Sequence, residues 1–430
     1  LICKCEKKNI KFAVDPWIFP AYHNSWLPDA FPSEINKFLQ ELNDLDFVLI
    51  THIHDDHFDP ILLEKICNSK TKIIMPKIFG YKLFESKLSK YNLSNKAIIL
   101  DCLKNFEFKG INITPIPPMN TSGIRIEDIS ESDISIDGGF LVESGNLKLG
   151  FLAENNPYNM EIIEKTKNCL LDLDLLAISH SGFASDYPFN YYKDKEKCLE
   201  IYSSLEKNRQ ESQLKIIKTY LKPKNILAYS SSFALAKTNK NWEYCAKKSL
   251  YFEPRKAAEQ FYFKTNINSF GLNLNDVLHI DEDKSKILNV KHTEFRKLSN
   301  NLLVTEKNKK RALEIFDLFQ KPIIPENDQR STELLIDQAT HNYFDSLKKF
   351  DLKPKFNIEI CTNSIRKKII NKNAKKDFVI QINIKDKLLR KILLKKIHWD
   401  EAMLTFEISY LRIPDSYCKQ TYLSIYNFIS

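Results

Sequence analysis

Leu49-Ile50-Thr51-His52-Ile53-His54-Asp55-Asp56-His57-Phe58-Asp59-Pro60 is the stretch that decides the fold. It continues the apolar run of residues 47–50, whose length and β-branched content predict a buried strand. Asp59-Pro60 then predicts a helix start, with aspartate as the N-cap and proline at the first helical position. The polar residues between them therefore lie at the carboxyl end of a buried strand, the usual place for a site in an α/β protein.

The spacing of the polar residues predicts a metal site. His52 and His54 are two residues apart, so their imidazoles point the same way in extended backbone. Asp56 and His57 follow in the turn, where the chain can direct both at a second point nearby. Imidazole and carboxylate suit zinc, iron or manganese, and the lack of cysteine argues against a purely structural zinc. The alternative is a polar turn that binds nothing, but ionisable groups packed so closely are costly unless something coordinates them.

Composition indicates a folded chain with room for more than one domain. The chain has 430 residues, of which 43% are hydrophobic and 12% aromatic. No apolar run approaches the length of a membrane span, and residues 1–5 are too short for the core of a signal peptide. Nine scattered cysteines, an odd number, favour reduced thiols and a cytoplasmic protein over a disulfide framework.

The net charge of +9 is dispersed along the chain. Its densest part runs from residue 366 to residue 396 and could attract phosphate-bearing ligands or RNA. Such a run is more often a solvated loop and helix face, and we prefer that interpretation. Neither a nucleic acid nor a membrane is therefore expected as a partner.

Short strands and helices alternate up to about residue 290, which predicts one large α/β domain with two sheets and helices outside. Residues 291–330 are predicted to be a helical connector, and residues 331–430 a smaller α+β domain. The latter has expected strands at 356–361 and 378–384 and a helix from residue 388.

The His-x-His-x-Asp-His pattern of residues 52–57 resembles that of the metallo-β-lactamase superfamily and is complete at all four positions. The resemblance implies an αββα sandwich over residues 1–290. It also implies a bridging carboxylate after the expected strand 147–152, where Glu154 stands in place of the usual aspartate. The metal ligands implied are His52, His54, Asp56, His57 and Glu154, and the cofactor implied is zinc or iron.

Two further histidines of the superfamily pattern are missing. None occurs near residues 116–120, and residues 230–232 are serines where the last histidine should follow a strand. His180 or His23 could supply a missing ligand, although a lone histidine at a strand end is more often structural. We therefore expect one tightly held ion, coordinated mainly from residues 52–57, with Glu154 or water completing its shell.

Other segments resemble the lactamase-fold part of CMP-N-acetylneuraminate hydroxylases and their bacterial relatives. These segments are Asp15-Pro16-Trp17, residues 182–188, residues 399–402 and residues 412–417. Those hydroxylases also carry a Rieske iron–sulfur domain, which needs Cys-x-His and Cys-x-x-His pairs. This sequence has neither pair.

Three functions fit these residues. The first is a metal-dependent hydrolase in which the metal activates water, with Asp56 as a ligand or as the base that orients the water. The second is an iron-dependent, hydroxylase-like oxygenase component that acts on a sugar nucleotide and draws electrons from a partner protein or an upstream Rieske segment. The third is a metal-binding protein without catalysis. A small-molecule substrate is expected for the first two, with a nucleotide sugar as one candidate.

Overall fold

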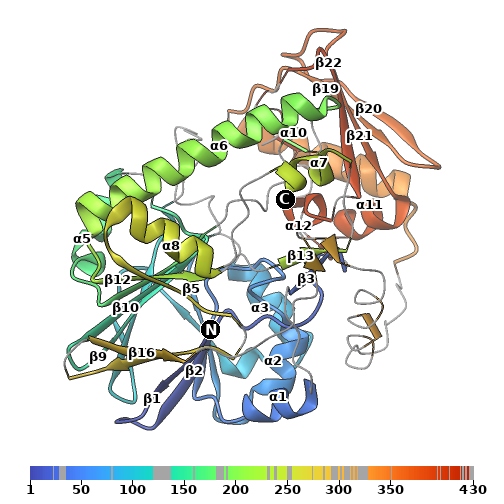
Figure 1. Cartoon of the computed structure of the whole chain (residues 1–430). Coiled ribbons are helices and arrows are strands. Elements are labelled where there is room, and N and C mark those ends of the chain that lie inside the picture. The colour runs from blue at the N-terminus through green and yellow to red at the C-terminus, as the bar shows by residue number, and fades with distance from the viewer. Residues whose placement is uncertain are drawn as a thin grey trace.

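The structure is a computed structural model of the whole chain (Figure 1). It describes residues 1–22, 24–28, 35–78, 81–119, 137–157, 160–180, 188–189, 192–229, 233–236, 240–248, 254–273, 275–283, 286–291, 299–300, 303–304, 310, 313–314, 317, 328–349, 351–394, 396–397, 399–405, 407–416, 418, 421 and 424–425. No helix among these residues is long and apolar enough to cross a membrane.

The first sheet carries the stretch that decides the fold. Its strands, in spatial order, are β1 (Ile2–Cys5), β2 (Ile10–Val14), β4 (Phe47–Leu49), β5 (Lys72–Pro76) and β6 (Ala97–Leu100). The β1–β2 pair is an antiparallel hairpin, and the other pairs are parallel. The carboxyl ends of β2, β4 and β5 therefore meet at one edge of the sheet, where the His-x-His-x-Asp-His residues follow β4.

The second sheet faces the first. Its strands, in spatial order, are β14 (Asn268–Gly271), β12 (Asn225–Tyr229), β11 (Leu175–Ser179), β10 (Leu147–Ala153), β9 (Gly139–Ser144), β8 (Ile111–Ile116) and β7 (Phe106–Phe108). The half from β10 to β14 is parallel, and the half from β7 to β10 is an antiparallel meander.

Alternation along the strands creates three apolar layers. Phe12 and Phe47 point between the sheets, where their rings stack at 4.7 Å, and Phe12 meets Phe151 of the second sheet edge-on at 6.3 Å. The neighbouring residues Ala13 and Val48 point outward, into the core beneath the helices. Burial on both faces explains why these strands read as nearly continuous apolar runs.

Helices cover both outer faces, so the layers are helix, sheet, sheet, helix (Figure 1). The helices on the first sheet are α1 (Ile35–Glu41), α2 (Pro60–Ile66), α3 (Tyr81–Ser89) and the short η1 (Ser94–Lys96). Those on the second sheet are α5 (Met160–Leu170), α6 (Lys195–Ile216), η2 (Ile217–Leu221) and α8 (Pro254–Thr265). The predicted αββα sandwich is confirmed, although helix α5 was not predicted.

Three smaller sheets contain the other described strands. The strands β17 (Ser299–Asn300), β18 (Leu303–Val304), β13 (Phe233–Leu235) and β3 (Trp26–Pro28) form one, and β15 (Val277–Asp281) and β16 (Lys286–Lys291) form a hairpin. The helix α7 (Lys240–Lys248) follows β13. The segment 291–330 was predicted to be a helical connector. Its described residues include the strands β17 and β18, of which β18 pairs with both β17 and β13, and helical residues at 310, 313–314 and 317.

The C-terminal part has an α+β arrangement. Its sheet has the order β20 (Arg366–Ile369), β19 (Asn357–Cys361), β21 (Val379–Ile384) and β22 (Ile408–Ile413). Its helices are α10 (Thr332–Lys349), α11 (Asp386–Leu393) and α12 (Trp399–Met403). The bounds 1–290, 291–330 and 331–430 proposed from the sequence stay a prediction.

An aromatic segment near the N-terminus joins the sandwich to the C-terminal part. The Trp26 indole nitrogen donates to the carbonyl oxygen of Leu404 at 2.9 Å, and the hydroxyl of Ser25 donates to that of Thr405 at 2.8 Å. Trp26 also stacks on Phe233 at 4.4 Å and is part of one core with residues of the C-terminal sheet. The two parts thus share buried apolar surface.

Replacing Trp26 by alanine should lower the free energy of unfolding by about 3–5 kcal/mol, because it empties a large buried volume and removes the bond to Leu404. Urea denaturation followed by circular dichroism measures the change. The matched control is Phe263→Ala, because that aromatic side chain is 88% exposed and its loss should change stability by no more than about 0.5 kcal/mol. Equal effects of the two substitutions would contradict the shared core.

Candidate metal centre

The loop that follows β4 is fixed at both ends. At its start, the Ile50 amide donates to the carbonyl oxygen of Ile74 on β5 at 2.9 Å. At its end, the Asp59 carboxylate accepts from the amides of Ile61 and Leu62 at 2.9 and 3.2 Å, and so caps α2 as predicted. Between these anchors the amides of His57 and Phe58 both donate to the His54 carbonyl oxygen, which makes the turn tight.

The first ligand group contains two histidines and two carboxylates. His52, His54, Asp137 and Glu154 each place a ligand atom within 4.8 Å of those of the others. His52 Nε2 lies 3.0 Å from His54 Nδ1 and 3.7 Å from an oxygen of Asp137. His52 is fully buried, so the atoms packed around its ring fix the orientation of that ring.

The second group contains Asp56, His57 and Glu154, again within 4.8 Å of one another. His57 Nε2 lies 3.6 Å from an Asp56 oxygen and 4.0 Å from an oxygen of Glu154. Glu154 therefore belongs to both groups and stands between them. All five residues named as ligands from the sequence lie at this one place. Their role as metal ligands stays a prediction.

Asp137 was not predicted from the sequence. It directly precedes Gly138-Gly139, and a Cβ on Gly138 would lie 2.9 Å from the carbonyl oxygen of Thr51 and 2.8 Å from Pro76 Cγ. Only a glycine lets the chain pass this close to the residue that precedes His52. The glycine pair was the available signal, since it marks a close approach of two backbones.

Asp15 supports the ligands from behind. One of its carboxylate oxygens accepts from the Thr51 amide at 2.8 Å, and the other accepts from the Thr51 hydroxyl at 2.7 Å and from His57 Nδ1 at 2.9 Å. The proton of His57 is thereby fixed on Nδ1, and Nε2 is directed at the carboxylates. The Thr51 hydroxyl also lies 3.0 Å from His52 Nδ1, so one carboxylate orients two imidazoles.

Tyr22 supports the site from the aromatic segment. Its hydroxyl donates to one oxygen of Asp56 at 2.6 Å, and the other oxygen of Asp56 faces His57. Burial, followed by the charge of Asp56, raises the pKa of Tyr22 well above its ordinary value. The phenol therefore keeps its proton and remains a donor.

Three residues next to the ligands have left-handed backbone conformations. Asp15, Tyr22 and Ala153 have φ values of 44°, 48° and 46°. Non-glycine residues in this region cost about 1–3 kcal/mol each and persist where the surrounding structure requires them. At Ala153 the β10–β11 register also shifts, and the next residue is Glu154. The strain thus coincides with the points at which the chain turns a side chain into the centre.

The charges of the cluster suit a cation. Burial, followed by the charges of His57 and His54, lowers the pKa of His52 well below its ordinary value, so this imidazole is neutral and can act as a ligand. Burial raises the pKa of Glu154 to about 7, and the carboxylates of Asp56 and Asp137 add to the rise. For His57, burial opposes the charged form, but Asp56 and Asp15 outweigh it and raise the pKa to about 9. Positive charge at this point would offset the crowding of the carboxylates.

The carboxylate side of the centre is reached by solvent. The side chains of Asp56, Asp137 and Glu154 keep 11%, 17% and 24% of their exposure, whereas the imidazoles of His52 and His57 keep 4% or less. A small molecule can therefore approach the ligand groups from the side of their carboxylates.

His180 lies elsewhere. It lines a small cavity with Gln210 of α6 and Phe261 of α8, on the outer face of the second sheet, and neither ligand group of the described residues includes it. His23 and residues 230–232 lie outside the described part of the chain. The proposal that His180 restores a second metal site therefore has no geometric support.

The C-terminal segments singled out in the sequence have packing roles. Trp399 is buried in the core of the C-terminal part. The guanidinium of Arg412 donates to Asp415 at 2.8 Å and lies over the ring of Tyr192, 4.3 Å from its centre. Residues 182–187 lie outside the described residues.

Comparisons with known proteins give short or distant likenesses. No family model matches the chain. A protein of Mycolicibacterium smegmatis named "Putative Rieske 2Fe-2S iron-sulfur protein" is 39% identical over 71 residues, which cover 16% of this chain and 13% of the relative. The match thus spans only about an eighth of that relative's length.

Two solved structures align with part of this chain. CmlA, a diiron β-hydroxylase from Streptomyces venezuelae, aligns with a TM-score of 0.40 and 17% identity over 62% of this chain and 50% of CmlA. YhfI, a metallo-β-lactamase fold protein from Bacillus subtilis, aligns with a TM-score of 0.30 and 13% identity over 55% of this chain and 90% of YhfI. The layers themselves, with the His-x-His-x-Asp-His residues at the carboxyl end of β4, give this chain the metallo-β-lactamase fold.

Proposed function

We propose that this chain is a metal-dependent hydrolase of the metallo-β-lactamase superfamily. The observation that carries the proposal is the position of Glu154, which belongs to two adjoining ligand groups at the end of the sandwich. When bound there, zinc or iron would lower the pKa of a water molecule and polarise the bond to be cleaved. Hydrolysis needs no other reactant than water and substrate, which makes it the simplest chemistry for these residues.

The site residues would have different roles in holding the metal ions and the water. His52 and His54 would offer imidazole nitrogens to the first ion, and Asp137 would offer a carboxylate oxygen. Asp56 and His57 offer the second position, and Glu154 can contact both. Tyr22 donates to one oxygen of Asp56, and the other oxygen, which faces His57, is placed to bind an ion or accept a proton from water.

The number of ions was expected to be one, because two histidines of the superfamily pattern are missing. That expectation counted Glu154 as the only ligand outside residues 52–57. Asp137 adds a second carboxylate, and the two groups then have four and three members. We infer that two ions bind, with Glu154 between them.

The donor set bears on the metal. The two groups hold three imidazoles and three carboxylates. Zinc accepts such ligands, but a high share of carboxylate is equally suited to iron or manganese. Zinc and iron therefore both remain candidates.

A second candidate function is an iron-dependent oxygenase component that acts on a sugar nucleotide. The match of 71 residues to a protein named for a Rieske iron–sulfur cluster supports it, as does the share of carboxylates among the ligands. This function requires an electron donor outside the described residues, in the form of a partner protein or a further segment.

Replacing His52 or His54 by alanine should remove most of the bound metal, because each loss leaves the first group without half of its imidazoles. Plasma emission spectroscopy of the purified variants measures the metal content, and circular dichroism checks the fold. His341→Ala is the matched control, since that side chain is 84% exposed on α10. Full metal occupancy in both site variants would refute the assignment.

Titration of metal-free protein with zinc, and separately with ferrous iron, should show two binding events per chain by calorimetry. Glu154→Gln keeps the shape but removes the charge that both groups share, so both events should weaken about tenfold or more. His180→Ala should leave both unchanged because its ring lies in another cavity. A single event in the native protein, or loss of the second event in His180→Ala, would show that our two-ion geometry is wrong.

The two functions differ in what they consume. The zinc- or iron-loaded protein should release p-nitrophenol from chromogenic phosphodiesters or esters under anaerobic conditions, and His54→Ala should lose this activity about a hundredfold or more. An oxygen electrode tests the alternative on the ferrous protein with a chemical reductant and sugar nucleotides. Oxygen uptake that depends on His54, together with no anaerobic hydrolysis, would replace the hydrolase with the oxygenase.

A further inference from the structure

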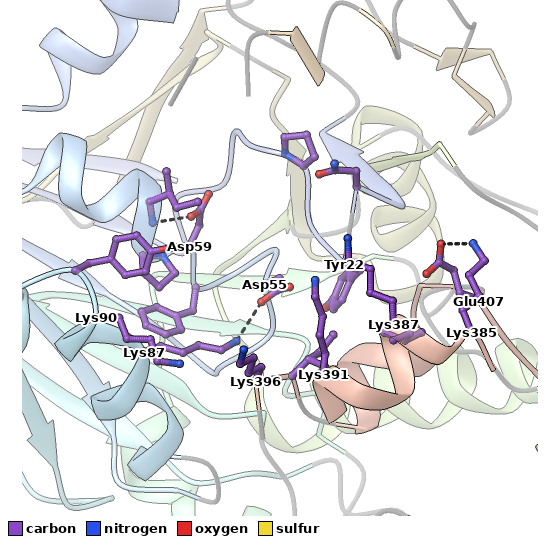
Figure 2. A pocket seen from close by; sticks show the side chains of 18 residues that line it. Tyr22, Asp55, Asp59, Lys87, Lys90, Lys385, Lys387, Lys391, Lys396 and Glu407 are labelled. Carbon is purple, nitrogen blue, oxygen red and sulfur yellow. Dashed lines mark hydrogen bonds and ion pairs between the residues drawn. The ribbon is translucent and has the colours of Figure 1, made fainter. Parts of the chain in front are cut away.

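A cavity of about 620 Å³ lies between the sandwich and the C-terminal part. One wall comes from the loop before α2 and from α3, and the other from α11 and the residues that follow it (Figure 2). Its volume is in the range of small-molecule sites, which is about 300–1,000 Å³. None of the residues in the two metal ligand groups lines it.

Lysine dominates the charge of this cavity. Among the described residues, the lysines that line it are Lys87, Lys90, Lys385, Lys387, Lys391 and Lys396. Figure 2 shows Lys87 and Lys90 on one side and Lys387 and Lys391 on the other, so the two walls present positive charge to each other. A concave surface lined with one sign of charge concentrates ions of the opposite sign.

Carboxylates offset only part of that charge. Three of the described carboxylates line the cavity, half the number of described lysines, and they are Asp55, Asp59 and Glu407. Lys87 pairs with Asp55 at 3.1 Å, and Lys385 pairs with Glu407 at 2.9 Å. Asp59 already accepts two amide hydrogens as the cap of α2. The described lining thus has six lysines against three carboxylates, which is an excess of positive charge.

The cavity also has an apolar lining. Ile61 and Tyr91 contribute it from the sandwich and Ile397 from the C-terminal part, while the buried side chains of Phe58 and Leu388 lie beneath. Small-molecule sites combine such surface with a few charged groups that fix the orientation of the ligand. A ligand that fits both features has anionic groups at one end and a ring or other apolar group at the other.

We propose that this cavity binds a phosphorylated small molecule with a planar ring, of the class of a nucleoside diphosphate. Its phosphates lie between Lys90 on one wall and Lys387 and Lys391 on the other, and its ring lies against the apolar lining. Lysine binds phosphate as a point charge, and several lysines around one group provide the multiple contacts that hold it. The enclosure of the charge between two walls favours a small anion over an extended polymer, which would need an open surface.

The proposed site adjoins the metal centre through two residues. Tyr22 lines the cavity and donates to Asp56, and Asp55 lines it as the neighbour of Asp56 in the chain. The site goes beyond the proposed hydrolytic function, since its lysines are not in either ligand group. Binding to it can therefore be measured on metal-free protein, independently of whether the metal chemistry is correct.

The test is calorimetric titration of metal-free full-length protein with pyrophosphate, with ADP and with UDP. We expect saturable binding of the nucleotides at submillimolar concentration, weaker binding of pyrophosphate, and loss of affinity as salt is raised. The double variant Lys387→Glu, Lys391→Glu should bind about tenfold more weakly or worse, because each charged contact contributes to affinity. Lys90→Glu, an exposed change on the opposite wall, should weaken binding in the same direction.

The matched control is the double variant Lys82→Glu, Lys372→Glu, which makes the same change of net charge at exposed positions outside the cavity. It should keep native affinity. Thermal denaturation shows whether each variant is folded, and Lys90→Glu decides the matter if the double variant on α11 does not fold. Equal weakening in the control and the cavity variants, or no saturable binding of any of the three probes to the native protein, would overturn the proposal.

Discussion

The carboxylate of Asp15 is the constraint on which the centre depends. It stands at the end of β2, and its three hydrogen bonds hold the backbone and hydroxyl of Thr51 and the ring of His57. The end of β2 is thus tied to the loop that follows β4, and the two imidazoles that flank this carboxylate take fixed orientations. The residue that orients the ligands is thus itself held by three hydrogen bonds, and its position follows from the pairing of β2 with β4.

Local backbone strain accompanies the fixed orientation of the side chains at the centre. Asp15, Tyr22 and Ala153 occupy left-handed backbone regions, and each is linked to a site residue by a hydrogen bond or by the chain itself. The apolar layers on both faces of the two sheets supply the stability that such strain costs. Asp15 and Ala153 lie at strand ends, and Tyr22 lies in a turn, because the pairing within a strand leaves no freedom to turn a side chain.

The sequence predicted what depends on local pattern. The apolar run 47–50, the cap at Asp59 and the strands of the sandwich follow from periodicity and capping, and the loop from His52 to His57 follows from spacing. Asp137 could not be found in this way, because its place depends on packing of Gly138 against the carbonyl oxygen of Thr51, far away in the chain. The strands β17 and β18 were missed for a similar reason, since β18 pairs with β13 through Leu303 and Leu235, far apart in the chain, and short strands have weak patterns of their own.

The lysines of residues 385–396 show the limit of reading charge from sequence alone. The basic run was interpreted as a solvated face, which is the commoner case. In the fold, α11 places part of it opposite Lys87 of α3 and Lys90 of the turn after α3, almost 300 residues earlier in the chain. Water screens charge less between two facing walls than on an open surface. The same lysines can therefore attract an anion, which an isolated solvated face would do only weakly.

One loop faces both environments. His52, His54, Asp56 and His57 contribute to the ligand groups, whereas Asp55, Phe58 and Asp59 line the lysine cavity. The turn in this loop is only a few residues long, so the cavity and the ligand groups are close together. Tyr22 contacts both, because it lines the cavity and donates a hydrogen bond to Asp56. An anion that settles among the lysines changes the field at Tyr22 and Asp55, and hence at the neighbouring Asp56. The electrostatics of the metal centre and of the cavity are therefore parts of one system, with the short loop as the wall between them.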